Sequence, residues 1–118
     1  MSDGFIHPEP FKADVCVEID DVIEKKIDMY HQHTSQMYEW LPYNRGALAE
    51  VPEGEKERRE WLGKTWSTRS NAEPFRDKLI ELYGNEKGRS IKHCEAFQDS
   101  GYGTRLTSEN FKEYFPFY

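Results

Sequence analysis

Two histidines separated by one residue, His31 and His33, are the first candidates for metal chemistry in this chain. Imidazole is a common zinc ligand, and a zinc site needs three or four converging donors. On a helix, however, residues two positions apart point about 200° away from each other. The other histidines, His7 and His93, lack ligand-like spacing. The sequence therefore predicts that this pair does not chelate a metal ion unless the helix breaks between them.

Three polar side chains, His33, Ser35 and Gln36, form a compact group late in the same predicted helix. One interpretation is helix-end chemistry, because histidine near a C-terminus favours the helix dipole and serine or glutamine can satisfy free carbonyl groups. The other is a polar network that holds a neighbouring loop or the wall of an active site. The residues alone favour helix-end chemistry.

Glu95 is a carboxylate inside a predicted strand over residues 89–97, on the same side as His93. A charge in that position must be paired, exposed at an edge or functional, and pairing with a basic residue is the commoner outcome. No complete hydrolytic or phosphoryl-transfer motif is present. No catalytic residue is therefore assigned from the residues alone.

The elements that must position these residues begin with a strand and a long helix. Residues 14–19 alternate apolar and polar side chains, the pattern of a half-buried strand. Asp20 is a candidate N-cap, and Pro42 is expected to end the helix. Between Asp20 and Pro42, the residues that would form the buried face of this helix recur in steps of four and three. They are Ile23, Ile27, Tyr30, Thr34, Met37 and Leu41.

Further helices are predicted in the middle of the chain. Residues 53–66 predict a polar helix with Trp61, Leu62 and Trp66 as its apolar points. Asn71 can cap a third helix, which Gly84 would end in the left-handed conformation. The buried stripe expected on this third helix is Phe75, Leu79 and Leu82.

The remaining segments complete a mixed α/β composition of two or three helices and two strands. Residues 1–12 predict a loop, Thr107 caps a short helical turn, and residues 111–118 form an aromatic C-terminal tail. Two strands alone make a marginal sheet. We therefore interpret residues 1–118 as a single partial domain, with part of the sheet supplied from elsewhere.

Composition limits the classes of partner. The net charge of −6 argues against nucleic acid or an anionic membrane as the main partner. No apolar run approaches the roughly 20 residues that span a bilayer, and the N-terminus does not resemble a signal peptide. Only two cysteines occur, Cys16 and Cys94, without a disulfide pattern. These features favour a cytoplasmic domain without a membrane span.

The run over residues 15–27, VCVEIDDVIEKKI, resembles a segment of the LmbE/PIG-L family of zinc-dependent N-deacetylases (GlcNAc-PI de-N-acetylase-like proteins), which reads VDIT-D-VIEKKI. Three further blocks follow in family order: HTSQ at 33–36, EAF at 95–97 with SGYG at 100–103, and FPF at 115–117. Within the SGYG block, Gly101 departs from the family pattern, which usually has an acidic residue there. The chain is thus similar to the C-terminal part of this family.

The resemblance implies the C-terminal portion of a Rossmann-like α/β domain. It implies that the full-length enzyme removes the acetyl group from an N-acetylated sugar or related substrate, with zinc held by an upstream His-Pro-Asp-Asp-type motif and a later histidine, and an Asp as general base. The His-Pro dipeptide at residues 7–8 continues with Glu-Pro, so no zinc ligand or base is carried over and no zinc is expected on this chain alone. His33, Ser35, Gln36 and Glu95 are carried over as family-motif residues without a role.

Two hypotheses from different classes follow. In the first, the chain is the C-terminal segment of a deacetylase, from a truncated or split reading frame, and is inactive without a missing N-terminal catalytic half or a homo-oligomer. In the second, it is a stand-alone protein-interaction module without catalysis, whose aromatic tail over residues 114–118 docks on a partner. A third is a reading frame that yields no stable protein. An in-frame upstream His-Pro-Asp-Asp motif would favour the first.

Overall fold

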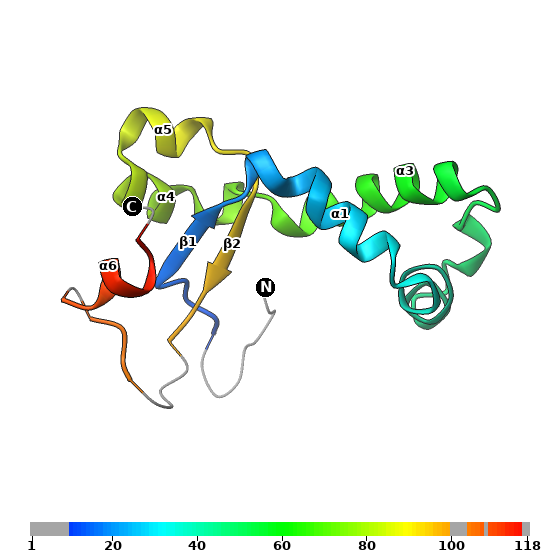
Figure 1. Ribbon diagram of the computed structural model, residues 1–118, viewed down its shortest axis with the longest axis horizontal. Coiled ribbons are helices and arrows are strands. Elements are labelled where there is room, and N and C mark those ends of the chain that lie inside the picture. The colour runs from blue at the N-terminus through cyan, green and yellow to red at the C-terminus, as the bar shows by residue number, and fades with distance from the viewer. Residues whose placement is uncertain (1–9, 100–103, 108, 117–118) are drawn as a thin grey trace. The chain divides into compact units, whose positions relative to one another are not determined.

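The structure is a computed structural model, and the residues that it describes are 10–99, 104–107 and 109–116. These residues are mixed α/β, with six α-helices and one two-stranded antiparallel sheet (Figure 1). The expectation of two or three helices was too low, because three of the α-helices have only four to six residues and show no helical periodicity in the sequence.

Internal contacts divide the chain into two compact units, which we describe separately. We call Ile19–Asn71 the helical unit, and Met1–Glu18 together with Ala72–Tyr118 the sheet unit. A compact unit is defined by its contacts and not by independent folding. The interpretation of the chain as one partial domain therefore stays a prediction.

In the sheet unit, β1 (Val15–Glu18) pairs antiparallel with β2 (Cys94–Phe97). Directly opposed residues share a face of the sheet, and Cys16 opposes Ala96. Cys16, Ala96 and Cys94 are all buried, whereas Val17 is only half-buried. A strand is therefore confirmed over Val15–Glu18, but burial does not alternate along it as predicted, since Val15 and Cys16, on opposite faces, are both buried.

The described part of the sheet unit also contains helices: η5 (Glu73–Phe75), α4 (Arg76–Tyr83), α5 (Asn85–Ser90) and α6 (Phe111–Tyr114). Of these, η5 and α4 contribute side chains to the core around Cys16. The predicted stripe on the third helix is confirmed, since Leu79 is fully buried and Phe75 and Leu82 pack against the same cluster. The N-cap positions are Ala72 for η5 and Phe75 for α4, so the N-cap predicted at Asn71 is wrong.

Helix α5 was missed, and the strand predicted over residues 89–97 begins later, at Cys94. Gly88 lets α5 pack closely on α4, because a Cβ atom at Gly88 would lie 2.6 Å from the Ile80 Cα atom. The Arg76 Nη1 atom donates to the carbonyl oxygen of Gly88 (2.6 Å) and of Ile91 (2.8 Å). These contacts with a distant part of the sequence stabilise a helix that has little local signal.

Gly84 ends α4 as predicted, but with a different backbone conformation. Its φ of 83° and ψ of 165° lie outside the left-handed helical region, in a region that only glycine adopts readily. The next residue, Asn85, begins α5, so Gly84 joins two helices rather than a helix and a loop.

Near the C-terminus, Thr107 caps the turn into α6 as predicted. Its Oγ1 atom accepts from the Asn110 amide (3.3 Å), and the Asn110 Oδ1 atom accepts from the Thr107 amide (2.8 Å). The Phe115 ring contacts the rings of Phe111 and Phe97 at centroid distances of 5.6 and 6.4 Å. The described part of the aromatic tail therefore packs, through Phe115, on its own unit.

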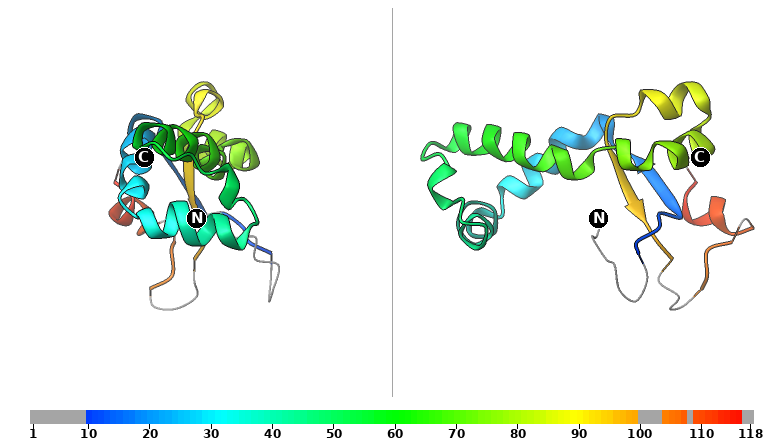
Figure 2. Two further views of the ribbon diagram at one scale, coloured as in Figure 1. Left: turned by 90° about the vertical axis from the view of Figure 1, so that its right-hand side faces the viewer. Right: turned by 180° about the vertical axis from the view of Figure 1, so that it is seen from behind.

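The helical unit consists of short and long helices in sequence. They are η1 (Asp20–Val22), α1 (Ile23–His31), η2 (Gln36–Trp40), α2 (Leu41–Asn44), η3 (Leu48–Glu50), α3 (Glu55–Trp66) and η4 (Ser67–Ser70). Helices α1 and α3 lie side by side (Figure 1). The left view of Figure 2 shows the η2–α2 segment from the side, with its axis across the view. The core contains Met37, Tyr38 and Leu62.

Two predictions for the first helix are wrong. Asp20 lies within the 3-10 turn η1, and the residue at the N-cap position of that turn is Ile19. The helix does not continue to Leu41, because it breaks after His31 and resumes as a π-helical turn, η2. Pro42 lies in the first turn of α2, where a proline is tolerated. The polar helix predicted over residues 53–66 is confirmed as α3.

Candidate functional site

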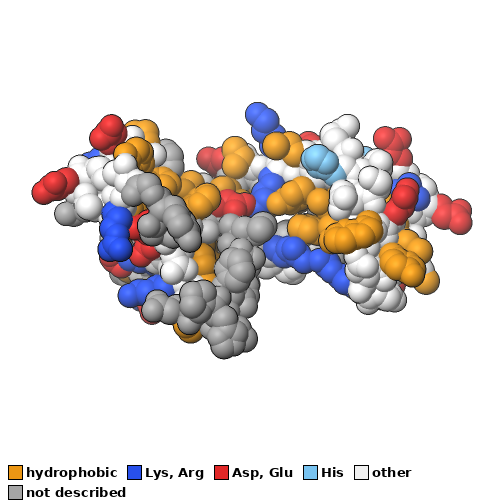
Figure 3. Space-filling view, turned by 90° about the horizontal axis from the view of Figure 1, so that it is seen from below, with side chains coloured by type: hydrophobic (Ala, Val, Ile, Leu, Met, Phe, Trp, Pro, Cys, Tyr) orange, Lys and Arg blue, Asp and Glu red, His pale blue; other side chains and the backbone are white. Residues whose placement is uncertain are grey.

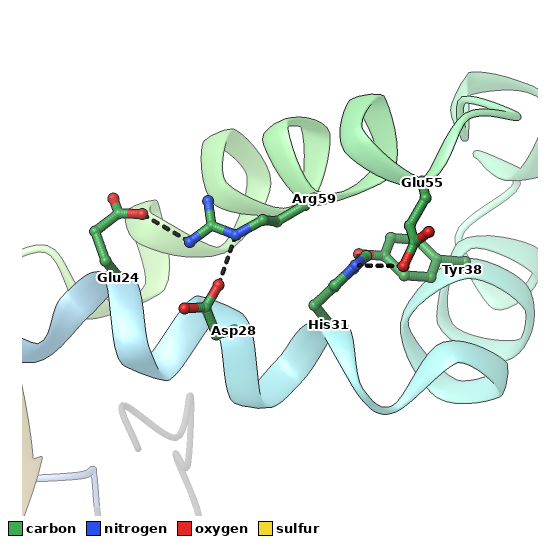
Figure 4. A network of polar contacts seen from close by, with 6 residues as sticks. All are labelled: Glu24, Asp28, His31, Tyr38, Glu55 and Arg59. Atoms are coloured by element: carbon green, nitrogen blue, oxygen red, sulfur yellow. Dashed lines mark hydrogen bonds and ion pairs between the residues drawn. The ribbon is translucent and has the colours of Figure 1, made fainter.

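A row of polar contacts joins α1 to α3 in the helical unit (Figure 4). Arg59 of α3 donates from Nε to Asp28 Oδ1 (2.6 Å) and from Nη2 to Glu24 Oε2 (2.9 Å). Glu24 and Asp28 are four residues apart and so share one face of α1. The hydrogen bond to Asp28, followed by that to Glu24, raises the pKa of Arg59. One guanidinium group therefore ties two turns of α1 to α3.

His31 continues this row at the last position of α1. Its Nδ1 atom lies 2.6 Å from the Tyr38 hydroxyl oxygen, and its Nε2 atom lies 4.0 Å from Glu55 Oε1 (Figure 4). The hydroxyl donates when Nδ1 is unprotonated and accepts when it is protonated. Both ring nitrogens of His31 thus face a side chain of the same unit.

Tyr38, His31 and Glu55 have the residue types of a proton relay, but their exposure argues for a structural role. Tyr38 is only 2% exposed, so a substrate cannot reach its hydroxyl in this conformation. Burial raises the pKa of Tyr38, although the nearby Arg58 and Arg59 charges oppose the shift. The hydroxyl therefore stays protonated at neutral pH. Its contact with His31 holds η2 against the end of α1.

The predicted group His33, Ser35 and Gln36 lies in the segment between the two ends of this hydrogen bond. All three side chains are exposed. The His33 amide donates to the Tyr30 carbonyl (2.9 Å), and the His33 carbonyl accepts from the Met37 amide (2.9 Å). Within the described part of the chain, none of the three side chains forms a hydrogen bond. Their polar groups are therefore available to a partner or ligand, and helix-end capping by these side chains is not observed.

Glu95 lies apart from this group, in strand β2 of the sheet unit. It opposes Val17 in the register and is half-buried. The structure therefore places the four family-motif residues in two compact units, three in the helical unit and one in the sheet unit. Their roles stay predictions.

The metal chemistry considered for His31 and His33 is not assembled in the described residues. The helix does break between the two histidines, but the His31 ring is held by Tyr38. No three side chains of His, Cys, Asp or Glu converge there as metal ligands. The described residues therefore do not assemble a ligand set for the zinc ion that the family resemblance implies.

Sequence reasoning missed Tyr38, Glu55 and Arg59. The spacing of Glu24 and Asp28 on one face of α1 indicates a shared cationic partner, but any of several basic residues in α3 fits that description. Tyr38 lies off the apolar face predicted for the first helix. The signal for its hydrogen bond is absent because it depends on the chain folding back after His31.

Several predicted features lie outside the described residues: His7, the turn over residues 100–103, and the end of the aromatic tail at residues 117–118. Among the described helices, none is both long and apolar enough to cross a membrane.

Comparisons of this chain with protein-family models, with curated proteins and with solved structures found no match. The resemblance to LmbE/PIG-L deacetylases therefore rests on the four sequence blocks alone.

Proposed function

We propose that this chain is the C-terminal portion of an LmbE/PIG-L-type deacetylase with a Rossmann-like fold. The complete enzyme would hydrolyse the N-acetyl group of an N-acetylated sugar or a related substrate, and this portion would be inactive alone. The observation that carries the proposal is the exposed segment 33–36, HTSQ, in which three polar side chains form no hydrogen bond with the described residues. This segment is also the second of the four blocks that resemble the family.

The proposed role of this segment is supported by its preorganised geometry. A recognition surface gains affinity when its geometry is fixed before binding. The partly buried hydrogen bond between His31 and Tyr38 connects the two ends of the segment, and η2 is a π-helical turn, which is frequent at functional sites. Imidazole, hydroxyl and amide groups can all hydrogen-bond the hydroxyl and amide groups of an N-acetylated sugar.

In this proposal the segment lines the substrate pocket and the metal chemistry belongs to the upstream half. The partner of the chain is then an N-terminal catalytic half or another copy of the enzyme. Zinc bound by that half would lower the pKa of its water and polarise the amide carbonyl. The residues of this chain would orient the sugar and exclude water.

A complementation experiment tests the proposal. The full chain is mixed with the N-terminal half of a related deacetylase that ends before the segment resembling residues 15–27. Sedimentation should show a one-to-one complex, and acetate should be released from N-acetylglucosamine only when both parts are present. His33→Ala should lower acetate release about tenfold while the complex persists, since a lost hydrogen bond is typically worth about 1–1.5 kcal/mol.

Lys56→Gln is the matched control, because Lys56 is 84% exposed and lies on the same unit. It should leave both complex and activity unchanged. Metal analysis of the chain alone should find no stoichiometric zinc. Failure to form a complex, or acetate release by the chain alone, would contradict the proposal.

The second candidate is the stand-alone interaction module, and a different surface from the aromatic tail favours it. Large apolar side chains of the helical unit are exposed: Met29 (63%), Trp40 (56%), Tyr43 (70%) and Leu48 (47%). Figure 3 shows hydrophobic side chains gathered on the surface of the helical unit. Exposed apolar patches commonly mark protein interfaces. Trp40→Ser together with Tyr43→Ser should abolish partner binding if this candidate is correct, and should leave the complementation unchanged if the first is correct.

A further inference from the structure

Two arginine side chains lie against the ring of Trp66. Trp66 is the last residue of α3, and Arg69 follows three residues later in the 3-10 turn η4. Residues three apart eclipse each other in a 3-10 helix, which places the Arg69 Cζ atom 4.1 Å from the Trp66 ring centroid. The Arg45 Cζ atom lies 5.7 Å from the same centroid. Two guanidinium groups therefore converge on one indole.

Neither of these guanidinium groups has a carboxylate partner within the described residues. Arg59 of the same unit is paired with Asp28 and Glu24, whereas Arg45 and Arg69 form no ion pair. Burial, followed by the charge of Arg45, lowers the pKa of Arg69. In a chain with a net charge of −6, this concentration of unpaired positive charge is unusual.

A cavity with a largely apolar lining adjoins Arg45 and the Trp66 ring against which Arg69 also lies. Its volume is about 120 Å³, and both Arg45 and Trp66 line it. An apolar cavity of about 150 Å³ binds benzene, so this cavity can take a group close to that size. Its apolar lining includes Met37, Leu41 and Trp61.

We propose that Arg45, Arg69 and Trp66 form a binding site for a small organic oxyanion that carries a flat apolar group. The phosphate or carboxylate lies against the two guanidinium groups, and the apolar group enters the adjoining cavity. This proposal does not depend on the function proposed above.

The chemistry of the site favours a ligand that has both an anionic group and a flat apolar group over a ligand that has only one of them. A planar guanidinium group matches phosphate or carboxylate with two parallel hydrogen bonds. A bound anion also relieves the repulsion between two like charges. The apolar group gains by leaving water, and a ring can pack against the indole of Trp66. Glu50 also lines the cavity, and its negative charge opposes the anion.

The experiment uses the full chain with phenyl phosphate and with benzoate as probes, which separates phosphate from carboxylate recognition. Inorganic phosphate and benzyl alcohol supply the two halves of the ligand separately. Binding is followed by calorimetry and by tryptophan fluorescence. At least one of the two probes should bind more tightly than inorganic phosphate and benzyl alcohol, and its affinity should fall with added salt.

Variants assign the binding to this site. Arg45→Gln and Arg69→Gln should each weaken binding about tenfold, since a hydrogen bond to a charged group is worth about 1.5 kcal/mol or more. Arg69→Lys should weaken it less, because it keeps the charge and loses the fork. Glu50→Gln should tighten it. Lys56→Gln removes one positive charge elsewhere on the same unit and should leave binding unchanged.

More than a third of each arginine residue is exposed, so the variants should remain folded, with at most the small loss of stability expected from a missing cation–π contact. Absence of binding by both probes would overturn the proposal. It would also be overturned if the arginine variants bound as tightly as the parent, or if inorganic phosphate bound as tightly as the better probe.

Discussion

In the sheet unit, Cys16, Leu79 and Cys94 meet in an apolar core, whereas in the helical unit Arg59 joins α1 to α3 through two carboxylates. The first kind of contact is shielded from water and insensitive to salt. The second is partly exposed, with 33% of the Arg59 side chain accessible, so solvent and ions weaken it. Both units bury apolar side chains, but the helical unit adds charged contacts between α1 and α3 to its own core of Met37, Tyr38 and Leu62.

The largest effect should come from the apolar core. Leu79 is fully buried, and Leu79→Ala should lower the free energy of unfolding by about 2–5 kcal/mol. Denaturant melts at low and high salt should give the same loss. Glu81→Ala is the control on the same helix, at a solvated position, and should change stability by no more than about 0.5 kcal/mol. A loss that depends strongly on salt would break the comparison.

The second-largest effect should be a loss of stability of the sheet unit at alkaline pH. The hydrogen bond with Cys94, followed by burial, raises the pKa of the Cys16 thiol above its usual 9.0. The folded state keeps its proton while the unfolded chain loses it, so this contribution is complete below pH 9.0 and declines above it. Between pH 9 and about pH 10.5 one such thiol accounts for about 2 kcal/mol. Cys16→Ala should flatten the profile, and an unchanged profile would contradict the assignment.

The hydrogen bond behind the exposed segment should have an intermediate effect. Tyr38→Phe removes the hydroxyl and leaves His31 Nδ1 without its partner, at a cost of about 1–2 kcal/mol. The variant should also give faster amide exchange over residues 33–36. Tyr43→Phe, at a position that is 70% exposed, should do neither. Equal stability of the two variants would show that the contact with His31 does not hold the segment.

The smallest effect should come from the charged contacts between α1 and α3. Arg59→Gln should cost about 1 kcal/mol or less, because the pairs are partly exposed. The loss should shrink at high salt, which screens the parent. A large loss that is independent of salt would mean that Arg59 acts through packing rather than charge.

Local patterns explain which parts of the fold could be predicted. The alternation in residues 14–19 and the spacing of Leu79 with its neighbours identified β1 and α4. Glycine at position 84 marked the end of a helix, because few other residues fit there. Each of these signals lies within a few residues of the feature that it predicts.

The failures have the opposite character. The break after His31 depends on Tyr38 returning to the end of α1, and α5 depends on Arg76 and on close packing against Ile80. Pro42 did not end a helix, because it stands in a first turn where its missing amide proton is not needed. The exposed group His33, Ser35 and Gln36 was identified by residue type, but its exposure and the hydrogen bond behind it follow from tertiary contacts.

The distribution of two residue types gives each unit its own spectroscopic reporter. All three tryptophans, at positions 40, 61 and 66, belong to the helical unit, and both cysteines, at positions 16 and 94, belong to the sheet unit. The thiols are buried, so their rate of alkylation reports opening of the sheet unit, while indole emission reports the helical unit. Coincident transitions in denaturant would show that the two units unfold as one cooperative block. Separate transitions would show that one unit opens while the other remains folded.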